Sequence, residues 1–185
     1  MARAKFAGIY TDDGAGTLVI YVTWEQRKLG EIVNVNSGKD YKHLNSGNIP
    51  VYGTGGYMLS VDKFLSNEDA VGIGRKGTID QPYILNAPFW TVDTLFYAVP
   101  KMSNDLNFVY GIFQIISWKK LDESTGVPSL SKQAINSVKI FIPSEDEQKK
   151  VGNYFKKLDS LIALHQRKLE MLKNLKKIML ARIFI

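Results

Sequence analysis

The sequence of 185 residues contains no cysteine and only two histidines, His43 and His165. The absence of cysteine excludes disulfide bonds and thiolate metal ligands. The histidines lie far apart and lack His-x-x-His or His-Glu-x-x-His spacing, so we expect no metal site. The longest apolar run, residues 17–24, is too short to span a membrane, and the N-terminus lacks the apolar segment of a signal peptide. We therefore expect a cytoplasmic protein without a membrane partner.

Positive charge is unevenly distributed along the chain, which has a formal net charge of +6. Residues 1–144 contain 14 Lys and Arg against 13 Asp and Glu, whereas residues 145–185 contain 10 against 5. Such a basic excess is typical of proteins with a polyanionic partner, but a basic helix is equally compatible with a solvated surface. The composition makes nucleic acid a candidate partner without establishing it.

Signals for catalysis are few, and the Gly-x-Ser-x-Gly turn of serine hydrolases is missing. Residues 72–77 have the Gly-x-Gly-x-x-Gly spacing of a dinucleotide-binding loop, but such a loop must open a helix. The residues that follow favour a strand and include a proline. We therefore predict a hairpin with a first strand at 70–74, a basic tip at Arg75 and Lys76, and a return strand from Thr78.

Two further motifs resemble catalytic sites without matching them. Glu147–Lys149 has the acid-x-lysine shape of some nuclease sites, but Glu147 is better explained by the start of a helix. Asp80–Tyr83 resembles the Asn/Asp-Pro-Pro-Tyr loop of methyltransferases, with glutamine in place of the first proline. No convincing cofactor-binding loop accompanies it. We expect a non-catalytic protein with no cofactor of its own.

The pattern of apolar residues predicts an α+β fold in which a β-rich part precedes a long helix. Residues 1–16 show no periodicity and are expected to form a loose lead-in. Turn residues separate the strands that we expect at 17–24, 31–36, 50–52, 57–61, 70–74, 83–85 and 89–99. After them we expect a helix at about 105–118, a short helix at 131–136 and a last strand at 138–142.

A long terminal helix is predicted from Ser144 onward, because Ser144 and Glu147 form a capping-box pattern. Apolar residues then recur in alternating steps of four and three, the heptad pattern of helices that pack lengthwise. We predict that this seam pairs with a partner helix, although it could instead fold back on the β-rich part. Its members are Val151, Phe155, Leu158, Ile162, His165, Leu169, Leu172, Lys176, Met179 and Ile183.

The polar loops of the β-rich part supply side chains that suit DNA. Arg and Lys can bind guanine edges, Asn can bridge adenine, and Lys, Ser and Thr can hold phosphates. A solvated loop would have a similar composition, so this pattern alone does not decide. The candidate DNA-binding residues are Lys39, Tyr41, Lys42, His43, Asn45, Ser46, Arg75, Lys76 and Thr78.

Several spaced motifs resemble the specificity subunits of type I restriction–modification systems, in the family's order. The segments WEQRKLGEI (24–32) and GNIPVYGTGG (47–56) resemble the opening of a target-recognition domain. IGRKGTI (73–79) and FWTVDTLFY (89–97) are similar to its middle. Residues 124–177 resemble its end and the helix that follows. The resemblance covers about residues 24–185.

This resemblance implies that the chain reads double-stranded DNA for a complex that methylates adenine or cleaves the DNA. Methyltransferase and restriction subunits would be its partners and would carry the sites for S-adenosylmethionine, ATP and magnesium. The family's subunits usually have two recognition domains and two long helices, whereas this chain has one of each. The resemblance then implies a half-subunit that forms a homodimer through an antiparallel coiled coil and reads two half-sites.

These considerations divide the chain into three parts. Residues 1–23 are a lead-in of uncertain structure, 24–143 are the target-recognition domain, and 144–185 are the spacer and dimerisation helix. Two alternatives stay open. One is an assembly or decoy protein whose helix pairs but whose β-rich part does not read DNA. The other is a small enzyme that uses the glycine-containing loop to bind a nucleotide.

Overall fold

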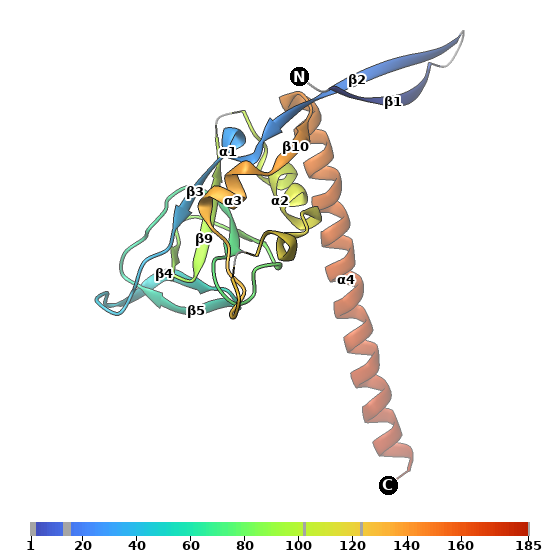
Figure 1. Cartoon of the computed structure of the whole chain (residues 1–185). Coiled ribbons are helices and arrows are strands. Elements are labelled where there is room, and N and C mark those ends of the chain that lie inside the picture. The colour runs from blue at the N-terminus through green and yellow to red at the C-terminus, as the bar shows by residue number, and fades with distance from the viewer. Residues whose placement is uncertain (1–2, 13–15, 102, 123, 185) are drawn as a thin grey trace.

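The computed structural model describes residues 3–12, 16–101, 103–122 and 124–184. It has a β-rich part with short helices, followed by one long helix, α4 (Glu145–Ile183), that extends well beyond the rest (Figure 1). The predicted α+β class is therefore confirmed. None of the helices in the described part of the chain is long and apolar enough to cross a membrane.

The central sheet is antiparallel, with the strand order β3-β9-β6-β7. Its inner strands read as nearly continuous apolar runs because both are buried along their length. One face packs against α2 (Leu106–Ile115), whose Phe108 and Phe113 enter the main core. The strands are β3 (Val33–Ser37), β6 (Ala70–Gly74), β7 (Tyr83–Leu85) and β9 (Leu95–Pro100).

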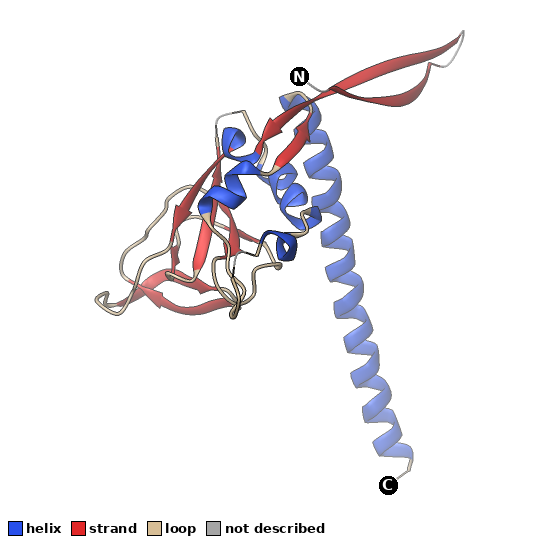
Figure 2. Cartoon of the chain, viewed as in Figure 1, coloured by secondary structure: helices blue, strands red, loops and turns tan. Residues whose placement is uncertain are grey.

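A second, smaller sheet has the order β5-β4-β8. β4 (Ser46–Gly53) and β5 (Gly56–Val61) form an antiparallel hairpin, and β8 (Trp90–Thr91) joins β4 in parallel. A separate core centred on Val51 and Trp90 holds this sheet together. Figure 2 shows this sheet beside several long loops, which form one end of the β-rich part.

The third sheet corrects the prediction of a loose lead-in. β1 (Arg3–Asp12) pairs along its whole length with the antiparallel strand β2 (Gly16–Lys28), and the last four residues of β2 pair with β10 (Lys139–Ile142). In Figure 1 this β1–β2 hairpin extends away from the β-rich part. The strand predicted at 17–24 lies within β2, but the residues of β1 show no apolar alternation from which a partner strand could be predicted.

Three predicted elements differ in detail. The strand expected at 31–36 begins as a short helix, α1 (Leu29–Ile32), and the strand expected at 89–99 is divided by a turn at 92–94 into β8 and β9. The helix expected at 105–118 ends earlier and is followed by a 3-10 helix, Trp118–Leu121. The short helix α3 (Lys132–Ser137) lies within one residue of its prediction. Burial of Leu29 and Trp118 in the main core overrides local propensity at these places.

The first two turns of α4 pack against α2. The Gln148 side chain is buried, accepts a hydrogen bond from the backbone N–H of Asp105 (3.2 Å) and donates one to the Pro143 carbonyl (3.2 Å). Gly152 is buried as well and lies against the start of α2. A Cβ at this position would collide with the Asp105 carboxylate and lie 2.7 Å from the Phe108 nitrogen. Close backbone contact at a glycine thus fixes where α4 leaves the β-rich part.

The predicted capping box is wrong in its side-chain contacts. Ser144 occupies the N-cap position, but its hydroxyl makes no capping hydrogen bond. Glu147 instead accepts a hydrogen bond from the indole nitrogen of Trp24 at 3.2 Å, which ties α4 to β2. The acid-x-lysine motif at 147–149 is therefore accounted for by packing between elements.

Candidate nucleic-acid interface and assembly helix

The loop that precedes β4 is anchored to the β8–β9 turn. The backbone N–H of Lys39 donates to the Thr91 carbonyl (2.8 Å), and that of Gly38 donates to the Leu95 carbonyl (3.0 Å). A Cβ on Gly38 would collide with the carbonyl oxygen of Val92, so only glycine fits beside this turn. Lys39 is exposed to solvent, while its backbone is anchored.

The second predicted basic segment, Arg75 and Lys76, follows β6 and contacts the same turn. The backbone N–H groups of Arg75 and Lys76 donate to the Thr94 carbonyl at 2.8 and 3.3 Å. The Arg75 guanidinium lies 5.8 Å from the ring centre of Phe96, and both cationic side chains are exposed. The residues 91–95 thus hold the two predicted segments beside one another, although they are far apart in the sequence.

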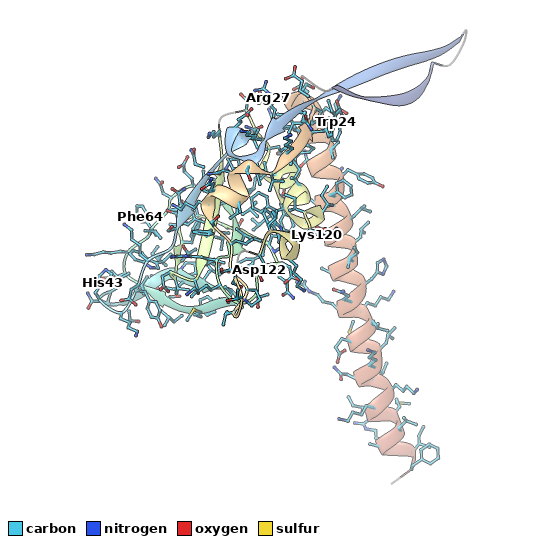
Figure 3. The ribbon with its side chains drawn as sticks, viewed as in Figure 1. Trp24, Arg27, His43, Phe64, Lys120 and Asp122 are labelled. Atoms are coloured by element: carbon cyan, nitrogen blue, oxygen red, sulfur yellow. The ribbon has the colours of Figure 1, made fainter. Side chains whose placement is uncertain are left out.

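The middle of the first loop is stiffened by an aromatic contact. The indole N–H of Trp90 donates to the Lys39 carbonyl at 2.9 Å, and the exposed His43 ring meets the Trp90 ring edge-on at 6.0 Å. His43 lies at the outer end of this loop in Figure 3. Lys42 is exposed, and its backbone N–H donates to the Asp40 carboxylate. The loop therefore presents a lysine and a histidine from a fixed support.

The end of the first loop is closed by one carboxylate. Asn45 donates to Asp62 through both its backbone N–H (3.1 Å) and its side-chain amide (3.0 Å). The side-chain hydrogen bond from Asn45 lowers the pKa of Asp62. Tyr41 is half-buried and accepts from the Leu44 N–H through its carbonyl, whereas Ser46, the first residue of β4, is exposed. The amide of Asn45 thus already has a structural partner.

The predicted return strand from Thr78 is wrong. The chain from Arg75 to Pro82 is a loop, and the strand that pairs with β6 begins only at Tyr83. Gly77 has a positive φ of 85°, and a Cβ on Gly74 would collide with the Thr78 carbonyl. These glycines serve a tight turn that no helix follows, which removes the basis for a dinucleotide-binding loop.

A third loop, which contains Gly126 and Pro128, supports the second basic segment through contacts that were not predicted. Lys76 forms an isolated bridge with Ser129, and the Gly77 N–H donates to the Pro128 carbonyl at 2.9 Å. Asp122 closes this loop by accepting from the backbone N–H of Ser129 (2.9 Å). Backbone hydrogen bonding by Ser129 lowers the pKa of Asp122. An Asp-x-Ser pattern followed by Gly and Pro was the available signal for such a loop.

Charge on this loop-built end is mixed. Lys39, Lys42, Lys63, Arg75 and Lys76 are exposed cations there, and the exposed carboxylates Asp40, Asp62 and Asp93 lie among them. Asp80 is already bound by Lys119 in an ion pair, which lowers its pKa through a side-chain hydrogen bond. A surface of this kind favours contacts at particular places over uniform attraction of phosphates.

The two histidines and the carboxylates of the described residues do not form a cluster of candidate metal ligands. No three His, Asp or Glu side chains come together there as ligands for a metal ion. His43 lies in the loop before β4, whereas His165 lies on the exposed part of α4.

The seam of α4 is mostly unburied. Val151 packs against the main core, but Phe155, Ile162, Leu169 and Leu172 are 50 to 54% exposed. Met179 and Ile183 are similarly exposed, whereas Leu158 is half-buried. The helix does not fold back on the β-rich part (Figure 1), which corrects that alternative. An exposed apolar stripe of this length indicates a surface for assembly.

The fold thus combines a β-rich part that ends in polar loops with a 39-residue helix whose apolar side is exposed. The sequence profile of the family described as type I restriction modification DNA specificity domain matches residues 21–174. The chain belongs to this family. The type I restriction enzyme MjaVIII specificity subunit of Methanocaldococcus jannaschii is 29% identical over 120 residues, which cover 64% of this chain and 26% of that protein.

Solved structures agree on the fold. The S subunit of the type I restriction-modification system from M. genitalium has a TM-score of 0.59 at 16% identity, covering 79% of this chain and 43% of that one. A chain from a type I R-M system, solved to explain complex assembly and conformational transition, has a TM-score of 0.66 at 16% identity and covers 84% and 43%. This chain spans less than half the length of each of these relatives.

Proposed function

We propose that this chain reads one half of a bipartite DNA target for a type I restriction–modification complex. The observation that carries the proposal is the meeting of Lys39, Arg75 and Lys76 at the 91–95 turn, within a DNA specificity domain. We assign DNA reading to residues 24–143 and assembly to residues 144–185. Residues 1–23, most of the β1–β2 hairpin, lie outside the reading domain in this division.

The individual side chains suit different parts of the DNA. Arg75 is placed to meet a guanine edge or a phosphate, and Lys39, Lys42 and Lys76 to hold phosphates. The exposed His43 lies at the outer end of the first loop (Figure 3). We assign the remaining candidates to shaping the loops. Tyr41 and Thr78 are half-buried, Asn45 is already hydrogen-bonded to Asp62, and the exposed Ser46 pairs with β5 as the first residue of β4.

The chemistry belongs to other chains in this proposal. A methyltransferase subunit would bind S-adenosylmethionine and methylate adenine, and a restriction subunit would use ATP and magnesium to cleave DNA. This chain would bring neither cofactor nor catalytic residue, and it would act in the cytoplasm. Two copies, joined through α4, would read two identical half-sites in inverted orientation.

Footprinting of this chain together with its cognate methyltransferase tests the proposal. We expect protection of two inverted half-sites at a fixed spacing, and an affinity that falls steeply as salt rises. Dimers that protect no sequence, and bind all DNA alike, would support the alternative of an assembly or decoy protein.

A further inference from the structure

The base of α4 carries an apolar pocket that the β-rich part leaves open. It has a volume of about 210 Å³ and lies between α2 and α4. Trp24, Ile112 and Ile115 line it from the β-rich part, and Val151 and Phe155, the first two residues of the seam, line it from α4. Ile115 is 81% exposed at its edge. The seam of α4 therefore begins inside this pocket.

We infer that the pocket receives Met179 and Ile183 from α4 of a second copy, in an antiparallel pair whose two helices overlap fully. This inference rests on the proposed function, because it needs the dimer, and it adds the register. The seam residues occupy the a and d positions of the heptad in turn, and in an antiparallel pair each a position of one helix faces a d position of the other. Full overlap then places Ile183 of one copy at Val151 of the other, and Met179 at Phe155.

A single charge selects this register. Lys176 is the one cation in the seam, and burying it without a carboxylate is costly. In full overlap Lys176 lies opposite Leu158, beside Asp159 of the second copy, and Lys173 lies on the same flank. Beyond its first turn α4 has two carboxylates, Asp159 and Glu170.

A shift of one heptad removes this partner. In the shorter overlap Lys176 lies opposite His165, beside Gln166, neither of which supplies a carboxylate. With the opposite shift Lys176 meets Val151 at the buried Gly152, where the second copy's helix also runs into the β-rich part. Each shift also moves Met179 and Ile183 away from the pocket residues that would bury them.

The register sets the separation of the two reading parts. From Gly152 of one copy to Gly152 of the other, full overlap gives about 45 Å along the helices, because each residue adds about 1.5 Å. One heptad changes this separation by about 10 Å. The pocket and Asp159 would therefore act together as a ruler for the spacing of the half-sites.

Cysteine cross-linking of the full chain tests the register, since the chain has no cysteine of its own. We expect the double variant Ile162→Cys/Leu172→Cys, which joins positions that face one another in full overlap and keeps Lys176 and Asp159, to form covalent dimers under mild oxidation. The matched pairs Leu158→Cys/Leu169→Cys and Leu158→Cys/Ile183→Cys report the two one-heptad shifts and should stay uncross-linked. Preferential cross-linking of either matched pair would overturn the inference while leaving a dimeric DNA reader intact.

A double-mutant cycle between Asp159 and Lys176, measured by the Kd of the dimer, tests the register without cysteine variants. Asp159→Asn should raise the Kd of the dimer about threefold to tenfold, and it should have no effect when Lys176 is already leucine. Glu170→Gln, at the other carboxylate, should leave the Kd unchanged. Equal effects of Asp159→Asn in both backgrounds would contradict the register. Footprinting is scored separately, so a correct register without specific DNA protection would refute the proposed function alone.

Discussion

Arg75 is the residue whose replacement best separates base reading from phosphate binding. If Arg75 contacts a base, Arg75→Ala should lower affinity for the target by about 1–3 kcal/mol and relax specificity at one position. If it holds a phosphate, affinity should fall equally for all sequences and the salt dependence should weaken by about one charge. Arg27→Ala is the control, because Arg27 is exposed and paired with Glu25 away from the loops. Binding to randomised DNA at several salt concentrations measures both quantities.

Gly152 and Gly111 form a matched pair of helix glycines with opposite expected effects. Gly152→Ala should destabilise the fold by about 1–3 kcal/mol, because its Cβ would meet the Asp105 carboxylate and the backbone of α2. Gly111 lies within α2 with no atom near its added Cβ, so Gly111→Ala should stabilise by up to about 1 kcal/mol. Urea unfolding measures both changes. Equal behaviour of the two variants would show that α4 does not pack closely on α2.

At the scale of elements, the contact between α2 and α4 depends on the buried amide of Gln148. Gln148→Leu should cost about 1–3 kcal/mol, because it leaves the Asp105 N–H and the Pro143 carbonyl without their side-chain partner. Gln133→Leu, on the exposed face of α3, is the control and should change stability little. Thermal unfolding compares the two. A stable Gln148→Leu protein would mean that packing at Gly152 alone fixes α4.

The elements also show what the sequence could and could not predict. β6 and β7 lie at the predicted bounds, and α4 was expected from its seam, because these signals are local and repeated. The strand predicted at 17–24 lies within β2, whereas β1 and its pairing with β2 were missed, since residues 1–16 show no apolar periodicity. The meeting of Lys39 with Arg75 at the 91–95 turn depends on contacts between distant segments, which no local pattern encodes.

At the scale of the whole molecule, the exposed stripe of α4 predicts that assembly and folding can be separated. Replacing Leu169 and Leu172 with lysine should yield monomers, because each leucine buried at the contact contributes about 1.5–3 kcal/mol. The β-rich part should stay folded, since both side chains are exposed and lie far beyond the part of α4 that packs on α2. Sedimentation gives the mass of the particle, and unfolding of the β-rich part gives its stability.

The same variant tests whether two reading parts act together on DNA. Once one reading part of a dimer is bound, the second binds its half-site at little further cost in translational freedom. The monomeric variant should therefore lose far more affinity for DNA with two half-sites than for DNA with one. The control is the double variant Ser160→Lys/Asn174→Lys, because it adds the same two positive charges to α4 at positions away from the seam. Monomers that bind the paired site as tightly as the native chain would contradict a dimeric reader, whatever their fold.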